Sequence, residues 1–204
     1  MSKSSVLERV GNGYVIVAKR ECATCVLVEP VIGQLAAAAS VNVYSQDDPQ
    51  FPRSVSGVID DSELDVSYFL EIETVPTLIK VENGAETGRV VGWNKNKWRE
   101  FTGITDIGDA LPPHRPGCGS RSVEPALAID LALRHGRIDI RSRRIEVATM
   151  EDEWEACYDR GWSDGLPVVP PTPERVVRML EGTARSPQEV VGIVPPDLAE
   201  CTVE

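Results

Sequence analysis

Two cysteines, Cys22 and Cys25, are separated by two residues and carry the most specific chemical pattern in the sequence. The apolar run 14–18 before them predicts a buried strand, and the Leu-, Val- and Ala-rich run 26–39 after them predicts a helix. Cys22 would then lie at the helix N-terminus, where the backbone dipole favours a thiolate, with Cys25 one turn further in. This geometry suits a reversible disulfide, with an exposed attacking sulfur and a resolving sulfur within reach.

The same spacing is compatible with two other structures, half of a zinc site or a pair of inert thiols in a scaffold. A zinc site needs a second Cys or His pair at short spacing. The two histidines, His114 and His135, are not paired with another ligand at close spacing. We therefore predict a redox pair, with no metal and no other cofactor.

The composition limits the partners and the compartment. The net charge of −11 over 204 residues argues against non-specific binding to nucleic acid or to acidic membranes. No apolar run approaches the roughly 18 residues needed to span a bilayer, and residues 1–9 lack the apolar segment of a secretory signal. Five cysteines, an odd number, fit a reducing cytoplasm better than a secreted disulfide scaffold.

Further along the chain, strand and helix signals alternate. Residues 41–44 predict a second strand, the polar stretch 45–61 a surface loop, and Ser62 the N-cap of a helix that runs through Leu70. A proline-initiated strand follows, and Asn-Gly at 83–84 predicts a hairpin to the next strand. Residues 95–101 predict a closing helix.

Residues 10–103, read together, resemble a thioredoxin-fold domain. The resemblance is carried by the Cys22–Cys25 pattern, Pro30, Val75-Pro76-Thr77, and the Asn83-Gly84 hairpin with Gly92. It implies an α/β fold with a central mixed sheet flanked by helices, and thiol–disulfide exchange. The proline matching Pro76 is cis in that family and packs beside the two sulfurs. The preceding residue, here Val75, offers backbone hydrogen bonds to a docked substrate.

The sequence departs from the family pattern in two places. The usual Trp-Cys-Gly-Pro-Cys is here Glu21-Cys22-Ala23-Thr24-Cys25, without the tryptophan and both central residues. The family's buried acid, six residues before the first cysteine, falls on Ile16, which cannot relay a proton. Glu21 should raise the pKa of Cys22, whereas Lys19 and Arg20 should lower it, and the sequence leaves that balance open.

The second half begins with a predicted linker. We divide the chain into a thioredoxin-like domain at 1–110, a proline-rich linker at 111–122 and a C-terminal segment at 123–204. Within the linker, Cys118 lies in a glycine-flanked turn before a predicted helix that Ser122 would cap. Arg115 and Arg121 would depress the pKa of its thiol. The alternative is a flexible linker with an unreactive cysteine.

The C-terminal segment is a smaller α/β region. Its arginine cluster at 134–144 is either a solvated strand face or docking edge, or an anion site. Residues 161–172, together with Cys118-Gly-Ser, resemble an uncharacterised bacterial family with a Cys- or Sec-Gly-Ser-Cys motif. That family's sequences continue past position 204, so we expect an incomplete domain that a protein partner or second subunit completes. A natural C-terminus is the alternative.

These observations predict a thiol–disulfide oxidoreductase component that acts on a thiol or disulfide substrate and supplies electrons to a partner or to a C-terminal centre. Cys157 and Cys201 are further candidate relay thiols, although neither has a second cysteine at a signature spacing. The alternative from another class is a non-catalytic assembly subunit. The expected catalytic residues are Cys22, Cys25 and Cys118, and the expected substrate-binding residues are Val75, Pro76 and Thr24.

Overall fold

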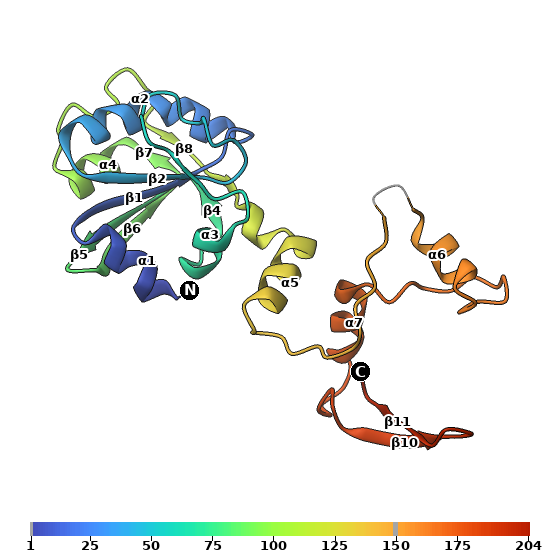
Figure 1. Ribbon diagram of the computed structural model, residues 1–204. Helices are drawn as coiled ribbons and strands as arrows, with labels where there is room; N and C mark the ends of the chain where they lie inside the picture. The colour runs from blue at the N-terminus through green and yellow to red at the C-terminus, as the bar shows by residue number, and fades with distance from the viewer. Residues whose placement is uncertain (1, 149–150) are drawn as a thin grey trace. The chain divides into compact units, whose positions relative to one another are not determined.

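The computed structural model describes residues 2–148 and 151–204. The chain divides into two compact units, one up to Leu131 and the other from Ala132 to Glu204. Each unit has its own arrangement of helices and strands (Figure 1). Within the part of the chain that the structure describes, no helix is both long enough and apolar enough to cross a membrane.

A five-stranded mixed sheet forms the centre of the first unit, in the order β3-β2-β1-β5-β6. Strand β1 pairs in parallel with β2 and antiparallel with β5. All but the first residue of β1 are buried, as expected of a strand covered on both faces. The strands are β1 (Gly13–Ala18), β2 (Val41–Ser45), β3 (Ile59–Asp60), β5 (Thr77–Glu82) and β6 (Ala85–Val91).

Four helices cover the two faces of this sheet. They are α1 (Lys3–Val10), α2 (Ala23–Ala38), α3 (Asp65–Phe69) and α4 (Lys95–Thr102). Figure 1 shows α2 and α4 on one face and α1 and α3 on the other. The core between these layers includes the paired indoles of Trp93 and Trp98 and the apolar face of α2. The layered α/β architecture predicted for this region is therefore confirmed.

The start of α3 differs from the prediction. Ser62 does not cap this helix, because the N-cap position belongs to Leu64, which makes no side-chain hydrogen bond there. The carboxylate of Asp61 instead accepts hydrogen bonds from the backbone N–H groups of Val66 and Ser67. An aspartate just outside the helix thus satisfies the amides that an N-cap serine would serve.

Residues 111–122, predicted as a linker, lie within the first unit. They contribute one strand to each of two short strand pairs. Strand β7 (Trp93–Asn94) pairs with β8 (His114–Arg115), and β4 (Thr74–Val75) pairs with β9 (Cys118–Gly119). The prolines fall outside the paired residues, before β8 and between β8 and β9, so the backbone donors of the short strands remain available. Ser120 caps a 3-10 turn, Arg121–Val123, and Ser122, predicted as the N-cap of the following helix, lies inside this turn. Helix α5 (Pro125–Arg134) follows.

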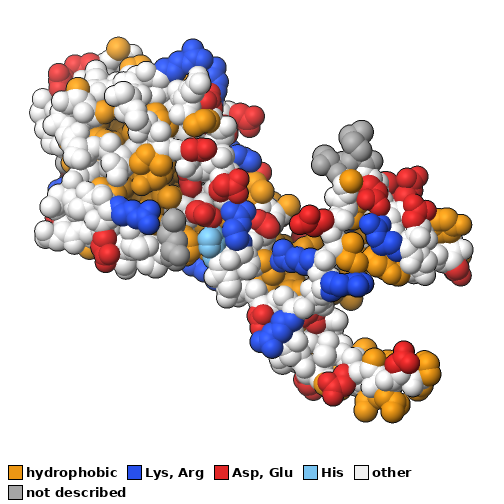
Figure 2. All heavy atoms as spheres, in the orientation of Figure 1, with side chains coloured by type: hydrophobic (Ala, Val, Ile, Leu, Met, Phe, Trp, Pro, Cys, Tyr) orange, Lys and Arg blue, Asp and Glu red, His pale blue; other side chains and the backbone are white. Residues whose placement is uncertain are grey.

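The second unit buries only a few hydrophobic side chains. Its elements are α6 (Glu153–Asp159), α7 (Pro173–Leu180) and the antiparallel pair β10 (Val190–Val194) and β11 (Ala199–Thr202). The arginine-rich stretch 137–144 has no regular secondary structure, so it is not the strand face that was one of its predicted interpretations. Figure 2 shows apolar side chains at the surface of this unit. They include Trp154, Tyr158, Trp162, Leu166, Val169, Met179, Ile193 and Leu198.

Candidate functional site

Cys22 occupies the N-cap position of α2, as the sequence predicts. Its sulfur accepts a hydrogen bond from the backbone N–H of Cys25 over 3.3 Å. The first four N–H groups at a helix N-terminus lack carbonyl partners within the helix, and the helix dipole adds partial positive charge there. The end of β1 and the start of α2 therefore hold the Cys22 sulfur where negative charge is stabilised.

The Cys22 thiol is strongly acidified. Its pKa is lowered from 9.0 to about 5, mainly because the Cys25 side chain hydrogen-bonds to it, and Cys118 and backbone N–H groups contribute further. Burial opposes this shift but does not outweigh it. The sequence predicts that the charges of Glu21, Lys19 and Arg20 set the pKa of Cys22. In the structure, none of these three charges is a cause of the shift in that pKa. The sulfur partners themselves make Cys22 a thiolate.

Cys25 has the opposite character. Burial raises the pKa of its thiol, and the hydrogen bond that it makes to Cys22 raises it further. The first cysteine is thus a thiolate and the second a protonated thiol that donates to it. This division of roles is that of an attacking sulfur and a resolving sulfur.

Cys118 lies beside Cys22. Strand β9 pairs antiparallel with β4, which places Cys118 directly opposite Val75. The Sγ atoms of Cys22 and Cys118 are 2.7 Å apart, and the Cys22 Sγ is 3.5 Å from the carbonyl oxygen of Val75. A disulfide bond has an S–S length of about 2.05 Å, so a shift of less than about 1 Å would join the two sulfurs. The structure therefore brings all three predicted catalytic cysteines together.

The exposure of Cys22 differs from the prediction of an exposed attacking sulfur. Cys22 is 0% exposed, as is Cys25, whereas Cys118 is only partly buried. The covering residues come from the segment 116–119, because this segment lies along β4 and over the N-terminus of α2. The thiolate of the site is consequently shielded from solvent by a third cysteine of the same chain.

The pKa of Cys118 also differs from the prediction. Burial raises the pKa of this thiol, and the hydrogen bond with Cys22 raises it further. Arg121, which we had expected to lower it, directs its guanidinium to the backbone carbonyl of Gln46. Arg115 is exposed in β8 and is not among the groups that set this pKa. Cys118 is thus the protonated partner of the Cys22 thiolate.

The segment that carries Cys118 is held on both sides. Before the cysteine, the Thr24 hydroxyl donates to the carbonyl of Pro116 over 2.6 Å. After it, the side-chain amide of Gln46 donates to the hydroxyls of Ser120 and Ser67, over 2.6 and 2.8 Å. Gln46, Ser67 and Ser120 are buried, so each of these bonds satisfies a group that water cannot reach. This polar network could not be predicted from the sequence, because its members come from distant segments.

The predicted substrate-binding residues contact the chain itself. The backbone of Val75 pairs with Cys118, and Thr24 contacts Pro116, so both of them bind the 116–119 segment. The Val75–Pro76 peptide bond is cis, and Pro76 is buried next to this pair. Ile16, at the position of the family's buried acid, is fully buried in β1 and supplies no titratable group.

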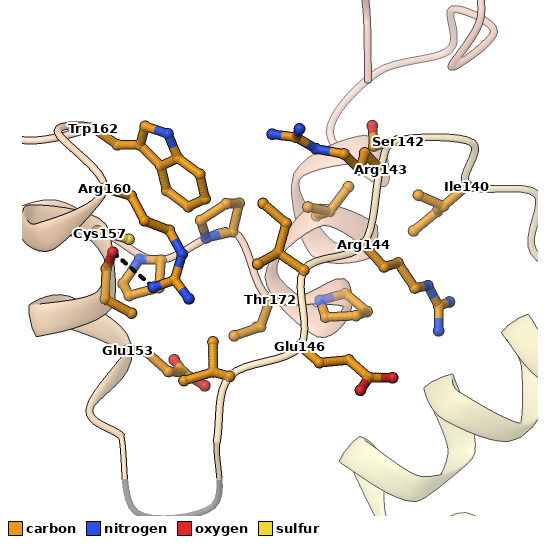
Figure 3. A pocket seen from close by; sticks show the side chains of 17 residues that line it. Ile140, Ser142, Arg143, Arg144, Glu146, Glu153, Cys157, Arg160, Trp162 and Thr172 are labelled. Carbon is orange, nitrogen blue, oxygen red and sulfur yellow. Dashed lines mark hydrogen bonds between the residues drawn. The ribbon is translucent and has the colours of Figure 1, made fainter.

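The other two cysteines belong to the second unit. Cys201 is exposed in β11, and Cys157 is buried in α6 at the edge of a cavity of about 690 Å³. Figure 3 shows Cys157, Arg160 and Trp162 on one side of this cavity and Arg144 and Glu146 on the other. Neither cysteine is within hydrogen-bonding distance of another cysteine among the described residues. The described residues also contain no group of three His, Cys, Asp or Glu side chains that could hold a metal ion.

The first unit has a thioredoxin-like fold, which is defined by the strand order of its sheet. The two cysteines lie where β1 meets α2, and Pro76 lies just before β5. Among solved structures, the chain is similar to thioredoxin O1 from Arabidopsis thaliana in its oxidized state, with 23% identity and a TM-score of 0.35 over 50% of this chain and 84% of that one. Thioredoxin O2 from the same plant gives 20% identity and a TM-score of 0.36, covering 50% and 87%.

A third similar structure is the thioredoxin Mala s 13 of Malassezia sympodialis, with 18% identity and a TM-score of 0.34 over 50% of this chain and 85% of that one. No protein-family model and no curated protein sequence matches the chain. These identities concern the fold alone.

Proposed function

We propose that the first unit carries out thiol–disulfide exchange, with Cys22 as nucleophile and Cys25 as resolving thiol. The observation that carries the proposal is the Cys22 thiolate at the N-cap of α2, with a pKa of about 5, hydrogen-bonded by the protonated thiol of Cys25. Cys22 attacks one sulfur of an oxidised substrate and forms a mixed disulfide, and the other sulfur leaves as a thiolate. Cys25 then attacks the Cys22 sulfur and releases the reduced substrate.

The resolving step also follows from the charges. While Cys22 is a thiolate, its negative charge and hydrogen bond hold the proton on Cys25. Once Cys22 is part of a mixed disulfide, that charge is gone and the Cys25 proton is easier to remove. Cys25 therefore becomes nucleophilic only after the first step, which orders the two reactions.

The second unit supports a role in an assembly. Its large apolar side chains, such as Met179 with 79% exposure, form more uncovered apolar surface than an isolated domain normally shows. We propose that a protein partner or a second subunit covers this surface and receives electrons from the Cys22–Cys25 pair. A reducing compartment such as the cytoplasm would keep the five cysteines available for this cycle.

The test is a redox titration of the full chain in buffers of defined dithiol-to-disulfide ratio, followed by alkylation and mass spectrometry. We expect Cys22 and Cys25 to become protected from alkylation together, as a two-electron couple. Replacing either cysteine with serine should abolish this couple, whereas Cys201→Ser, the matched control in the second unit, should leave the midpoint unchanged. Alkylation of both Cys22 and Cys25 at every ratio would contradict the proposal.

A non-catalytic assembly subunit is the second candidate. The complete burial of Cys22 and the exposed apolar surface of the second unit favour it. An assembly subunit needs the fold but not the cysteine chemistry, so the variant Cys22→Ser separates the two. If the assembled protein with Cys22→Ser reduces a disulfide as fast as the wild type does, the assembly function is the one that remains.

A further inference from the structure

The Cys22 thiolate is reactive but inaccessible. It is 0% exposed, and the segment 116–119 lies against it, since this segment pairs with β4, contacts Thr24 in α2 and carries the sulfur that touches Cys22. A disulfide in solution cannot touch Cys22 unless this segment moves away. Cys118 is only partly buried, and its sulfur is 2.7 Å from that of Cys22. The path from solvent to the buried pair therefore leads through Cys118.

The cover is fixed in its place by specific contacts. Thr24 holds Pro116 on one side, and Gln46 holds Ser120 on the other. Gly117 is fitted closely to β4, since a Cβ atom there would collide with the Thr74 side chain and lie 2.7 Å from the Val75 carbonyl oxygen. Moving the segment away would break these contacts, whereas exchange through Cys118 leaves them intact.

The neighbours of Cys118 leave room for a reactant. A Cβ atom on the adjacent Gly119 would meet nothing within 4 Å, so no other residue packs against this neighbouring position. Cys118 itself is partly exposed. Its inner side faces Cys22 and its outer side faces solvent, as a relay thiol requires.

We propose that Cys118 is the substrate-facing thiol of a three-thiol relay and passes an external disulfide to the buried pair through an intramolecular Cys22–Cys118 disulfide. This inference rests on the proposed function of Cys22 and Cys25. It names the internal reaction partner of that pair, and it assigns the external substrate to the class of exposed or low-molecular-weight disulfides.

The relay has three exchange steps. First, the Cys22 thiolate takes the Cys118 proton, and the Cys118 sulfur attacks a disulfide RSSR, which forms Cys118–S–S–R and releases RS⁻. Cys22 gives that proton to the departing RS⁻ and becomes a thiolate again. Second, the Cys22 thiolate attacks the Cys118 sulfur of the mixed disulfide and expels the second RS⁻. Third, Cys25 attacks the Cys22 sulfur, and its proton moves to the released Cys118 thiolate.

The atoms and electrons balance over these steps. RSSR gains two electrons and, with one proton from the chain and one from solvent, leaves as two RSH or the corresponding thiolates. Cys22 and Cys25 lose two electrons and end as a disulfide, while Cys118 returns to its starting state. An external dithiol then reduces the Cys22–Cys25 disulfide, which is the turnover that thiol–disulfide exchange already requires.

The first experiment traps the intermediate. The full chain with Cys25→Ser, Cys157→Ser and Cys201→Ser is treated with glutathione disulfide, alkylated and digested with trypsin without reduction. Cys22 lies in the tryptic peptide 21–53, and Cys118 lies in the peptide 100–121 because Pro116 prevents cleavage after Arg115. We expect these two peptides to be joined. Glutathione on Cys22 with an alkylated Cys118 would overturn the relay.

The second experiment establishes which cysteine reacts first. Single-turnover reduction of glutathione disulfide is compared among the wild type, Cys118→Ser and the control Cys201→Ser. Because access limits the rate of exchange, we expect Cys118→Ser to react at least about tenfold more slowly, while its Cys22–Cys25 disulfide still forms at equilibrium. With Cys22→Ser, glutathione should accumulate on Cys118. An unchanged or faster rate for Cys118→Ser overturns the relay.

The two proposals fail in different ways. If the wild type never forms the Cys22–Cys25 disulfide at any redox ratio, the exchange function itself is wrong. If that disulfide forms normally and Cys118→Ser is as fast as the wild type, the exchange function stands and only the relay is wrong.

Discussion

Cys118 lies opposite Val75 in an antiparallel strand pair, and this register places its sulfur 2.7 Å from the Cys22 sulfur. The pairing is formed by residues more than forty positions apart in the sequence, and it occupies the edge of β4 next to the cysteine pair. A short strand of this kind is weak by itself, because two residues make few backbone hydrogen bonds. The side-chain contacts around it must therefore supply much of its stability.

The first prediction concerns the fit of Gly117. The substitution Gly117→Ala puts a methyl group against Thr74 and the Val75 carbonyl, so we expect β9 to move away from β4 and uncover Cys22. The alkylation rate of Cys22 by iodoacetamide, measured on its tryptic peptide, should then rise by roughly tenfold or more, since access controls thiol reactivity. Gly119→Ala is the matched control, because its new methyl group meets nothing within 4 Å. Equal rates for the two variants would contradict the covering role of the segment.

The second prediction concerns Gln46. Its side-chain NH₂ group donates to the hydroxyls of Ser67 and Ser120, and its side-chain oxygen Oε1 accepts a hydrogen bond from the backbone N–H of Arg121. The substitution Gln46→Leu removes these three hydrogen bonds and leaves the backbone N–H of Arg121 without its acceptor, at a cost of about 1–3 kcal/mol, whereas Ser67 and Ser120 keep their bonds to Asp61 and Ser122. Hydrogen exchange of the amides of residues 118–122 should accelerate by roughly 5–150-fold, the factor that corresponds to this free energy.

Gln34→Leu is the control for this experiment. Gln34 lies in α2, is exposed, and accepts a hydrogen bond from the backbone N–H of Gly108. Its loss should leave the exchange of residues 118–122 unchanged. If Gln46→Leu also leaves that exchange unchanged, the polar network does not hold the Cys118 segment.

The local elements of the first unit could be predicted from the sequence because their signals lie within short windows. The apolar run of β1, the apolar residues of α2 and the Asn83-Gly84 turn each specify one element without help from distant residues. In the turn, both Asn83 and Gly84 adopt positive φ, which these two residue types favour. The thioredoxin-like arrangement follows from the order of these elements.

The covering of Cys22 could not be predicted in the same way. Proline density at 111–117 indicates a break in regular structure, and the short β8 and β9 contain too few residues to show a strand pattern. The contact between Cys118 and Cys22 depends on a register between distant segments. The exposure of Cys22 and the pKa of Cys118 depend on that contact, so the predictions of an exposed Cys22 sulfur and of a lowered Cys118 pKa were wrong.

The last prediction concerns the pKa of Cys22, which the two neighbouring thiols lower. Removing a hydrogen-bond donor to the thiolate should raise this pKa, and the donation from Cys25 is the largest cause of the shift. We therefore expect Cys25→Ala to raise it most and Cys118→Ala to raise it less. Alanine is used rather than serine because a serine hydroxyl could still donate to the sulfur.

The measurement is the ultraviolet absorbance of the thiolate as a function of pH, in a chain with Cys157→Ser and Cys201→Ser so that only the site contributes. With all three site cysteines present, a thiolate should form as the pH rises through about 5, since an acid with a lowered pKa loses its proton at lower pH. In the two alanine variants this transition should move to higher pH, toward the ordinary value of 9.0. A transition that stays near pH 5 in Cys25→Ala would mean that the helix N-terminus, and not the neighbouring thiols, makes Cys22 acidic.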